Sequence, residues 1–248
     1  MYKESFLMAW ASLIANKMRS ILTMLGIIIG VAAVIALVSI GNGVKQDIQN
    51  SISSLGSNLL MVMPGAPRTP GVRPTPGSMK SLKVADYEAI AKLDGVKAAS
   101  PMTNGAYVVI YQNKNWTTSV SGVNANYLDV NNWSMKSGRF LSEKNVQNRE
   151  RVAVVGKTVV KNLFGDENPV GAEIRVKNIP FRIIGVLNSK GSGAMGNDQD
   201  DMVIIPYTTA MERVDGIDYL RMIYVVGKDE NGIDRLQSDI ENLLRVRH

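Results

Sequence analysis

Three acidic residues that stand close together in a glycine-rich stretch could bind a metal ion. Asp198, Asp200 and Asp201 follow directly after Asn197, and carboxylate and amide oxygens are the ligands that calcium prefers. Their spacing differs from that of an EF-hand loop, which also requires a glutamate at its twelfth position. The pattern therefore favours a solvated loop over a calcium site, and we predict no metal site in the chain.

The same stretch contains a phosphate-loop-like run of glycines. Residues 191–196 read GSGAMG, which resembles the GxGxxG pattern. That pattern binds nucleotides only between a strand and a helix, and a Walker loop also ends in a Lys-Ser/Thr pair. The sequence supplies neither context here. We therefore predict a flexible loop and no cofactor bound by the chain itself.

The residue inventory argues against catalysis. The chain has no cysteine, and its one histidine is His248, the last residue. Thiol nucleophiles, disulfides, zinc–thiolate sites and an internal imidazole base are thereby excluded. A Ser-Lys dyad stays open because serines are numerous, but no feature of the sequence marks one. We predict a protein that is not an enzyme.

The net charge of +6 raises the question of nucleic acid as a partner. The basic residues are scattered, several flank an apolar stretch, and they form no basic helix or patch with interleaved aromatic residues. Nucleic-acid-binding proteins concentrate their positive charge on one face. The sequence therefore predicts no nucleic-acid partner.

The longest apolar run is long enough to cross a bilayer. Residues 21–41 read ILTMLGIIIGVAAVIALVSIG without a charge. As a helix they rise about 31 Å, and the hydrocarbon core of a bilayer is about 30 Å thick. The run exceeds the apolar core of a signal peptide and lacks an A-x-A cleavage site. We predict a transmembrane helix over 21–41, with the lipid bilayer as a partner.

Charge next to this helix predicts its orientation. Lys3, Lys17 and Arg19 precede it, whereas Lys45 is the only basic residue between Asn42 and Pro64. By the positive-inside rule the N-terminus lies in the cytoplasm and the residues after about 42 lie outside.

Small residues on the predicted transmembrane helix suggest close helix packing. Gly26 and Gly30 form a GxxxG pair, and Ala32 and Ala36 repeat the spacing one face over. Small side chains allow two helix backbones to approach each other within lipid. The partner helix could come from a later span of the same polypeptide or from a second copy.

The first 20 residues have the pattern of an amphipathic helix. Their apolar residues recur at helical spacing and oppose a polar side. Such a helix can lie at the cytoplasmic membrane surface, with Trp10, Lys17 and Arg19 as interface anchors. The alternative is a straight extension of the transmembrane helix.

Beyond the membrane, two strand–helix pairs bracket a strand-rich insert. The first pair is an apolar strand at 59–63 and a helix that starts with Ser81 as N-cap and ends before Asp94; the second is a strand at 222–226 and a helix at 231–245. Between the first strand and its helix, 64–80 holds five of the nine prolines and predicts a loop. A further strand is expected after the second helix, so we expect the C-terminal end to be a truncation of a longer domain.

The strand-rich insert is predicted to contain several short elements. Strands are expected at 106–111, 117–123, 151–155, 173–176, 181–186 and 202–205, and a helix at 157–164.

Several short motifs resemble one family of membrane proteins. Residues 16–31, NKMRSILTMLGIIIGV, closely resemble the first-span signature of the MacB-type, or FtsX-like, ABC-transporter permeases. Further matches cover essentially the whole chain: GSNL at 56–59, SGRF at 137–140, PVG at 169–171, RIIGVL at 182–187 and GNDQDD at 196–201, which leads to IP at 205–206.

The resemblance implies an architecture. It is an α+β membrane protein with a cytoplasmic amphipathic helix (1–20), one transmembrane helix (21–41) and a stalk helix (42–57). A mixed α/β porter-like subdomain (58–95 and 216–248) with two strand–helix halves then carries an inserted β-rich lobe (96–215).

The resemblance also implies a function. Such permeases lie in the bacterial cytoplasmic membrane, form dimers, pair with a cytoplasmic ABC ATPase that binds ATP and magnesium, and often dock a periplasmic adaptor, or membrane-fusion, protein. They are thought to transmit ATP-driven motion to the outer domain and to expel macrolides, peptides, toxins or lipoproteins. Because no ATPase domain is fused to this chain, we expect that ATPase on a separate subunit; the chain also lacks the later spans of such permeases.

Two other functions remain open. The chain could be a single-pass, membrane-anchored binding or sensor protein whose outer domain recognises a ligand, or an anchored hydrolase, which would need a catalytic group that the sequence does not mark. The residues that follow position 248 in the gene would separate the first alternative from a permease.

Overall fold

The computed structural model describes residues 3, 8, 16–55, 58–65, 80–193, 197–229 and 232–248. The chain divides into two compact units, Met1–Asn50 and Ser51–His248. Most of the predicted amphipathic helix (1–20) and of the predicted proline-rich loop (64–80) lies outside the described residues, and so do the last two residues of the predicted stalk.

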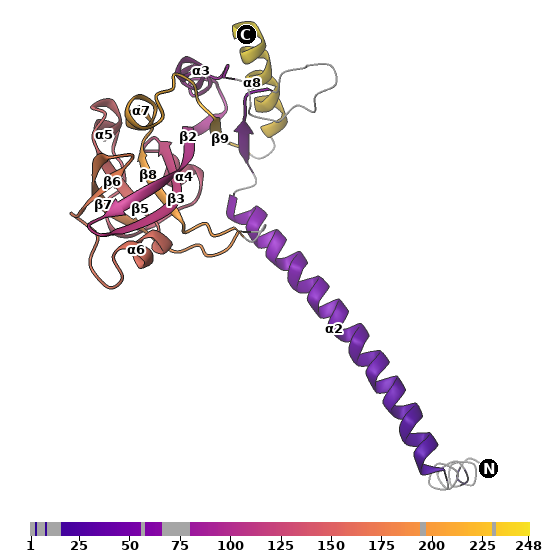
Figure 1. The fold of residues 1–248 in the computed structure, drawn as a ribbon. Helices are drawn as coiled ribbons and strands as arrows, with labels where there is room; N and C mark the ends of the chain where they lie inside the picture. Colours follow the sequence, from indigo (N-terminus) through magenta and orange to yellow (C-terminus); the bar gives the residue numbers. More distant parts are fainter. Residues whose placement is uncertain are drawn as a thin grey trace, which may run out of the picture. The chain divides into compact units, whose positions relative to one another are not determined.

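Helix α2, Lys17–Leu55, contains the whole apolar run (Figure 1). Its 39 residues give a length of about 58 Å at a rise of 1.5 Å per residue. The segment Lys17–Gly43 is long and apolar enough to cross a membrane, and none of it is buried within the protein. The helix continues to Leu55, so the residues predicted as the start of a stalk are helical.

The second unit, Ser51–His248, which we name the outer unit after its predicted location, contains a three-stranded antiparallel sheet. In this sheet β9 (Met222–Gly227) lies between β1 (Leu59–Val62) and the first part of β2 (Val96–Tyr111). Helices α3 (Val84–Ile90) and α8 (Ile233–Arg247) complete two strand–helix pairs. Alternate residues of β9 are buried, as expected for a strand with one face on a core.

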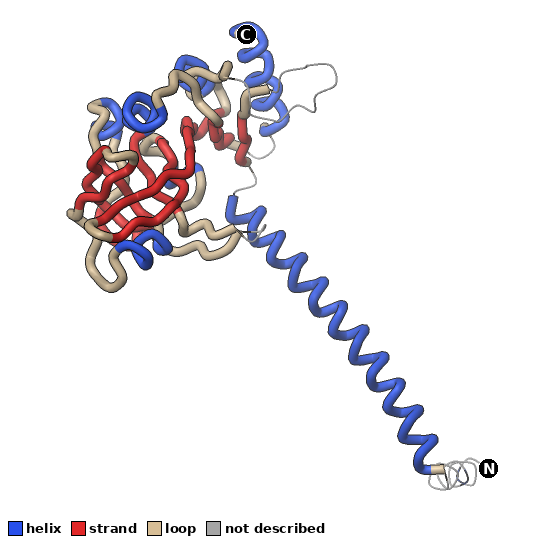
Figure 2. Tube along the Cα trace, in the orientation of Figure 1, coloured by secondary structure: helices blue, strands red, loops and turns tan. Residues whose placement is uncertain are grey.

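The rest of the outer unit is built around a small closed barrel (Figure 2). Strand pairing runs β2–β3–β8–β5–β7–β6 and returns to β2, while β4 adds to β7 from outside. Closure leaves these strands without a free edge, apart from their ends. Their bounds are β3 Lys114–Val123, β4 Met135–Gly138, β5 Val152–Val155, β6 Glu173–Val176, β7 Ile179–Leu187 and β8 Met202–Pro206.

Buried apolar side chains fill the barrel. Val109, Val155, Ile174, Phe181 and Ile205 are fully buried in one cluster, which α6 (Lys157–Leu163) also joins. The barrel is therefore a packed core and not a channel.

Short helices connect the barrel strands, and the sequence did not predict them. They are α4 (Tyr127–Val130), α5 (Glu143–Gln147), α7 (Tyr207–Thr209) and a π-helix, η1 (Ala210–Asp215). Each is too short for its apolar residues to show a helical period.

Strand β2 differs most from its predicted extent. The sequence predicted a strand over 106–111, whereas β2 spans Val96–Tyr111. Pro101 and the pair Asn104-Gly105 read as breaks, because proline cannot donate to a strand ladder and Asn-Gly favours turns. The structure accommodates Pro101 opposite Ile223, two residues before pairing with β3 begins at Thr103.

The start of α3 was also predicted wrongly. The helix begins at Val84 with Lys83 as its N-cap, not at Ser81. The Lys83 backbone N–H donates to Asp86 Oδ2 at 2.8 Å, which fixes the first turn at this position.

Candidate functional site

The apolar surface of α2 is the first candidate site. Residues 21–43 of the helix are exposed, and they include the predicted packing residues Gly26, Gly30, Ala32 and Ala36. Within the described part of the chain, no atom outside the helix lies within 4 Å of a Cβ built on Gly26 or Gly30. Among the described residues, nothing covers the glycine face of α2, and no contact there requires glycine.

The predicted interface anchors are only partly described. Lys17 and Arg19 stand exposed in the first turn of α2, just before the apolar run. The Thr23 hydroxyl donates back to the Arg19 carbonyl oxygen at 2.9 Å, which satisfies a polar group at the start of that run. Trp10 lies outside the described residues.

The acidic cluster organises the loop between β7 and β8. Asp200 is 4% exposed and accepts hydrogen bonds from the Ser189 hydroxyl and from the Lys190 and Gly191 backbone N–H groups. Asp198 Oδ2 accepts from the Thr158 hydroxyl, and Asp201 Oδ1 accepts from Trp116 Nε1. Each of the three carboxylates thus holds part of the loop in place.

The glycine-rich run forms part of a hairpin-like loop. Ser192 bridges to Asp198, and the Gly193 N–H donates to the Asn197 carbonyl oxygen at 2.8 Å. Residues 194–196 lie outside the described residues. The loop leads into β8, not into a helix, so the context that a phosphate loop needs is missing from the described residues.

Lys190 holds this loop against the segment after α4. Its Nζ donates to the Asn131 carbonyl oxygen at 2.7 Å and lies 4.7 Å from the centroid of the Trp133 ring. Burial lowers the pKa of the Lys190 ammonium below its usual value. This contact fastens the loop to the segment that follows α4.

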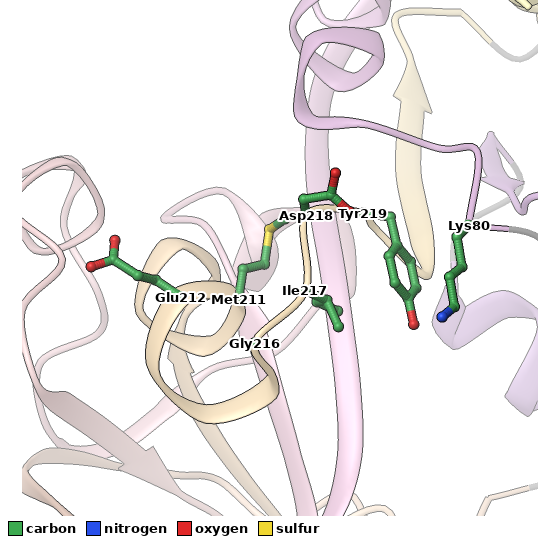
Figure 3. Close-up of a pocket in the computed structure, with 7 residues that line it drawn as sticks. All are labelled: Lys80, Met211, Glu212, Gly216, Ile217, Asp218 and Tyr219. Atoms are coloured by element: carbon green, nitrogen blue, oxygen red, sulfur yellow. The ribbon is translucent and has the colours of Figure 1, made fainter.

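An open pocket lies beside the π-helix (Figure 3). It has a volume of about 450 Å³, and the Lys80 ammonium lies 5.7 Å from the centroid of the Tyr219 ring at its mouth. Asp218 is engaged by Lys83 Nζ at 2.7 Å, and this contact lowers the pKa of the Asp218 carboxyl. The remaining lining residues are Met211, Glu212, Gly216 and Ile217. The pocket offers one cation and an aromatic ring, and the described residues around it form no nucleophile–base pair.

Three of the short motifs meet at β7. Gly171 N–H donates to the Ile183 carbonyl oxygen at 2.8 Å, and Arg139 N–H donates to the Ile184 carbonyl oxygen at 2.9 Å. A Cβ on Gly138 would collide with that Ile184 oxygen, and one on Gly185 would collide with the Arg139 carbonyl oxygen. The glycines of SGRF and RIIGVL therefore let two backbones approach closely. Gly171 of PVG differs, because no described atom lies within 4 Å of a Cβ built on it.

A buried carboxylate at the end of α8 was missed by the sequence analysis. Asp86 is 2% exposed and accepts from Arg247 Nε at 2.7 Å, while His248 Nε2 lies 2.9 Å from its other oxygen. Burial is the largest influence on the Asp86 carboxyl and raises its pKa. The hydrogen bonds from Arg247, the Lys83 N–H and His248 outweigh burial, so the pKa lies below its ordinary value.

Comparison with protein families gives one match across nearly the whole chain. Residues 20–243 match the family described as "MacB-like periplasmic core domain". The match therefore includes most of the apolar helix as well as the outer unit.

Curated relatives are similar over the full chain. The macrolide export ATP-binding/permease protein MacB of Rhodospirillum rubrum is 43% identical over 100% of this chain and 38% of its own length. Its namesake from Wolinella succinogenes is 38% identical over 99% of this chain and 38% of its own length. The chain thus spans little more than a third of these relatives.

Solved structures share the outer fold. The periplasmic region of MacB from Actinobacillus actinomycetemcomitans is 25% identical, with a TM-score of 0.67 over 79% of this chain and 87% of that one. The extracellular domain of the noncanonic ABC-type transporter YknZ from Gram-positive bacteria is 18% identical. Its TM-score is 0.64 over 77% of this chain and 95% of that one, and at this identity the match shows a shared fold only.

Proposed function

The chain belongs to the MacB family of ABC-transporter permeases, as a portion that carries the periplasmic core domain, and on that premise we propose that it works in an ABC-type exporter. One observation carries this proposal: a single family match runs from the apolar helix through the outer unit. An apolar helix of this length joined to such a domain suits a protein that acts on both sides of a membrane.

In this proposal α2 crosses the cytoplasmic membrane of a bacterium. Lys17 and Arg19 face the cytoplasm, and the residues after about 42 lie outside. The exposed apolar surface of Lys17–Gly43 supports this placement, because in water that surface would be costly.

The driving force would come from ATP hydrolysis outside this chain. An ABC ATPase binds ATP and magnesium on the cytoplasmic side, a second permease copy completes a dimer, and an adaptor docks on the outer unit. The exported substrates would be peptides, antibiotics such as macrolides, or similar compounds. The relatives' names, which combine macrolide export, ATP binding and permease, support this assignment.

We propose that α2 passes ATP-driven motion outward and that its glycine face packs against another transmembrane helix. Support comes from the open surface at Gly26 and Gly30, where a second backbone can approach closely.

Replacing both glycines tests this mechanism. Gly26→Leu with Gly30→Leu in the gene of the source cells should abolish export and leave ATP hydrolysis running, because bulky side chains separate the helices. Accumulation of labelled macrolides and peptides, together with ATPase activity in isolated membranes, measures both effects.

Ile27→Leu is the matched control, because it places the same residue type one position away, where no glycine is lost. It should leave export unchanged. Normal export by the double glycine variant would count against helix packing at this face. If deletion of the gene changed the accumulation of no labelled compound, the exporter assignment itself would fail.

A further inference from the structure

We infer that the three-stranded sheet and the barrel of the outer unit form one rigid, cooperative body with no hinge between them. The predicted subdomain boundary after residue 95 suggests two parts that could move separately. Four features of the structure join them: one strand, a hydrophobic cluster on each of the two faces of the sheet, and one buried asparagine.

Strand β2 belongs to both parts without interruption. Met102 pairs with Met222 of β9, and the next residue, Thr103, pairs with Gly122 of β3. The one register shift with β9 lies near the start of the strand, between Val96 and Ala98. A hinge needs residues whose φ and ψ can change freely. Because β2 changes its pairing partner between two consecutive residues, Met102 and Thr103, no unpaired residue lies between its two parts.

The barrel connections contribute side chains to the core of the sheet. Tyr207 of α7 and Met211 of η1 are buried in one cluster with Ile223 of β9, Ile90 of α3 and Leu236 of α8. This cluster belongs to neither part alone. Movement between the parts would expose it to water, and such exposure is unfavourable in proportion to its area.

The opposite face of the sheet is also covered by the barrel side. The ring of Tyr127 in α4 meets that of Tyr224 in β9 edge to face, with centroids 6.3 Å apart. Both tyrosines pack in a separate hydrophobic cluster, which includes Val123 and Ile204 of the barrel. The sheet is therefore held from both faces.

Asn124, at the end of β3, adds a polar connection. It is 2% exposed, and its Nδ2 donates to the Ala99 carbonyl oxygen and to the Tyr87 hydroxyl, each at 3.0 Å. Its Oδ1 accepts from the Asn126 N–H at 3.2 Å. One barrel side chain thus satisfies groups on both β2 and α3, and separation of the parts would leave buried polar groups unpaired.

The two parts should therefore move together when either is displaced. Domains of one chain usually move against each other where their interface is small and polar. Here the interface is a continuous core. If a force rotates the sheet, the barrel should rotate with it by the same angle.

Native-state hydrogen exchange of the full chain in detergent tests the cooperativity. Ile174→Val weakens the barrel core, and Ile240→Val weakens the helix that covers the sheet; both residues are buried. In each variant, hydrogen exchange at the slowest-exchanging amides should accelerate by about two- to tenfold. Within one variant, the factor should be the same in β5 as in β9. Acceleration confined to the mutated part would overturn the inference.

Spin-label distances test the rigidity. The chain has no cysteine, so labels attach only where a cysteine is introduced. Glu88→Cys with Lys161→Cys spans the two parts at exposed positions, and Lys136→Cys with Lys161→Cys is the control within the barrel. The first pair should give a single distance distribution as narrow as the control; a second peak or a broader distribution would contradict a hinge-free body.

Discussion

Gly138→Ala should lower the free energy of unfolding of the outer unit by about 3–5 kcal/mol. Gly138 has φ +72°, a conformation that costs a side-chain-bearing residue about 1–2 kcal/mol. In addition, its new Cβ would collide with the Ile184 carbonyl oxygen, which is backbone and is held by the Arg139 N–H. Since β4 cannot retreat without losing its pairing with β7, both costs add.

Gly165→Ala is the matched control for this prediction. Gly165 has φ +66°, and within the described residues no atom lies within 4 Å of a Cβ built on it. It should cost only the conformational part, about 1–2 kcal/mol. Denaturant unfolding of the full chain, followed by the fluorescence of Trp116 and Trp133, measures both. Equal losses in the two variants would show that the close approach at Ile184 does not matter.

Asp86→Asn should destabilise the outer unit by about 2 kcal/mol at pH 7. The carboxylate is buried and receives hydrogen bonds from Arg247 Nε and the Lys83 N–H, so the variant loses charge-assisted bonds that water cannot replace. The control is Asp218→Asn. It removes the ion pair between Asp218 and Lys83, which is 2.7 Å long, as is the ion pair between Asp86 and Arg247, but the Asp218 side chain is 85% exposed. This control should change stability far less than Asp86→Asn, because an exposed ion pair is screened by water.

The lowered pKa of Asp86 predicts that the stability of the outer unit depends on pH. Because the folded pKa of Asp86 lies below its unfolded value of 3.8, its contribution is complete above that value and is lost as the pH falls through the folded pKa. Below about pH 4 the parent chain should therefore lose stability more steeply than Asp86→Asn. Parallel stability curves for the two chains would contradict the assigned pKa direction.

Local signals predicted much of the fold. The apolar run 21–41 lies within α2 because length and lack of charge define such a helix without tertiary contacts. Strand β6 has the predicted bounds, since Ile174 and Val176 alternate with exposed Glu173 and Arg175.

Features that depend on distant partners were missed. Strand β4 reads MKSG and has no apolar pattern; it is a strand because β7 supplies its hydrogen bonds. Asp86 and Arg247 are separated by 161 residues, and no local pattern indicates that they meet. The motifs around Gly138 and Gly185 were recognised, but their role became visible only with β7 beside them.

Labelling of single cysteines in intact cells tests most directly whether α2 places the outer unit outside the cytoplasm. Glu88→Cys lies at an exposed position of the outer unit, and Lys3→Cys precedes α2. A membrane-impermeant maleimide, applied after the outer envelope is opened, should modify Glu88→Cys at once and Lys3→Cys only after the cytoplasmic membrane is broken. The reverse pattern, or a polypeptide that stays soluble without detergent, would contradict the placement on which the export proposal rests.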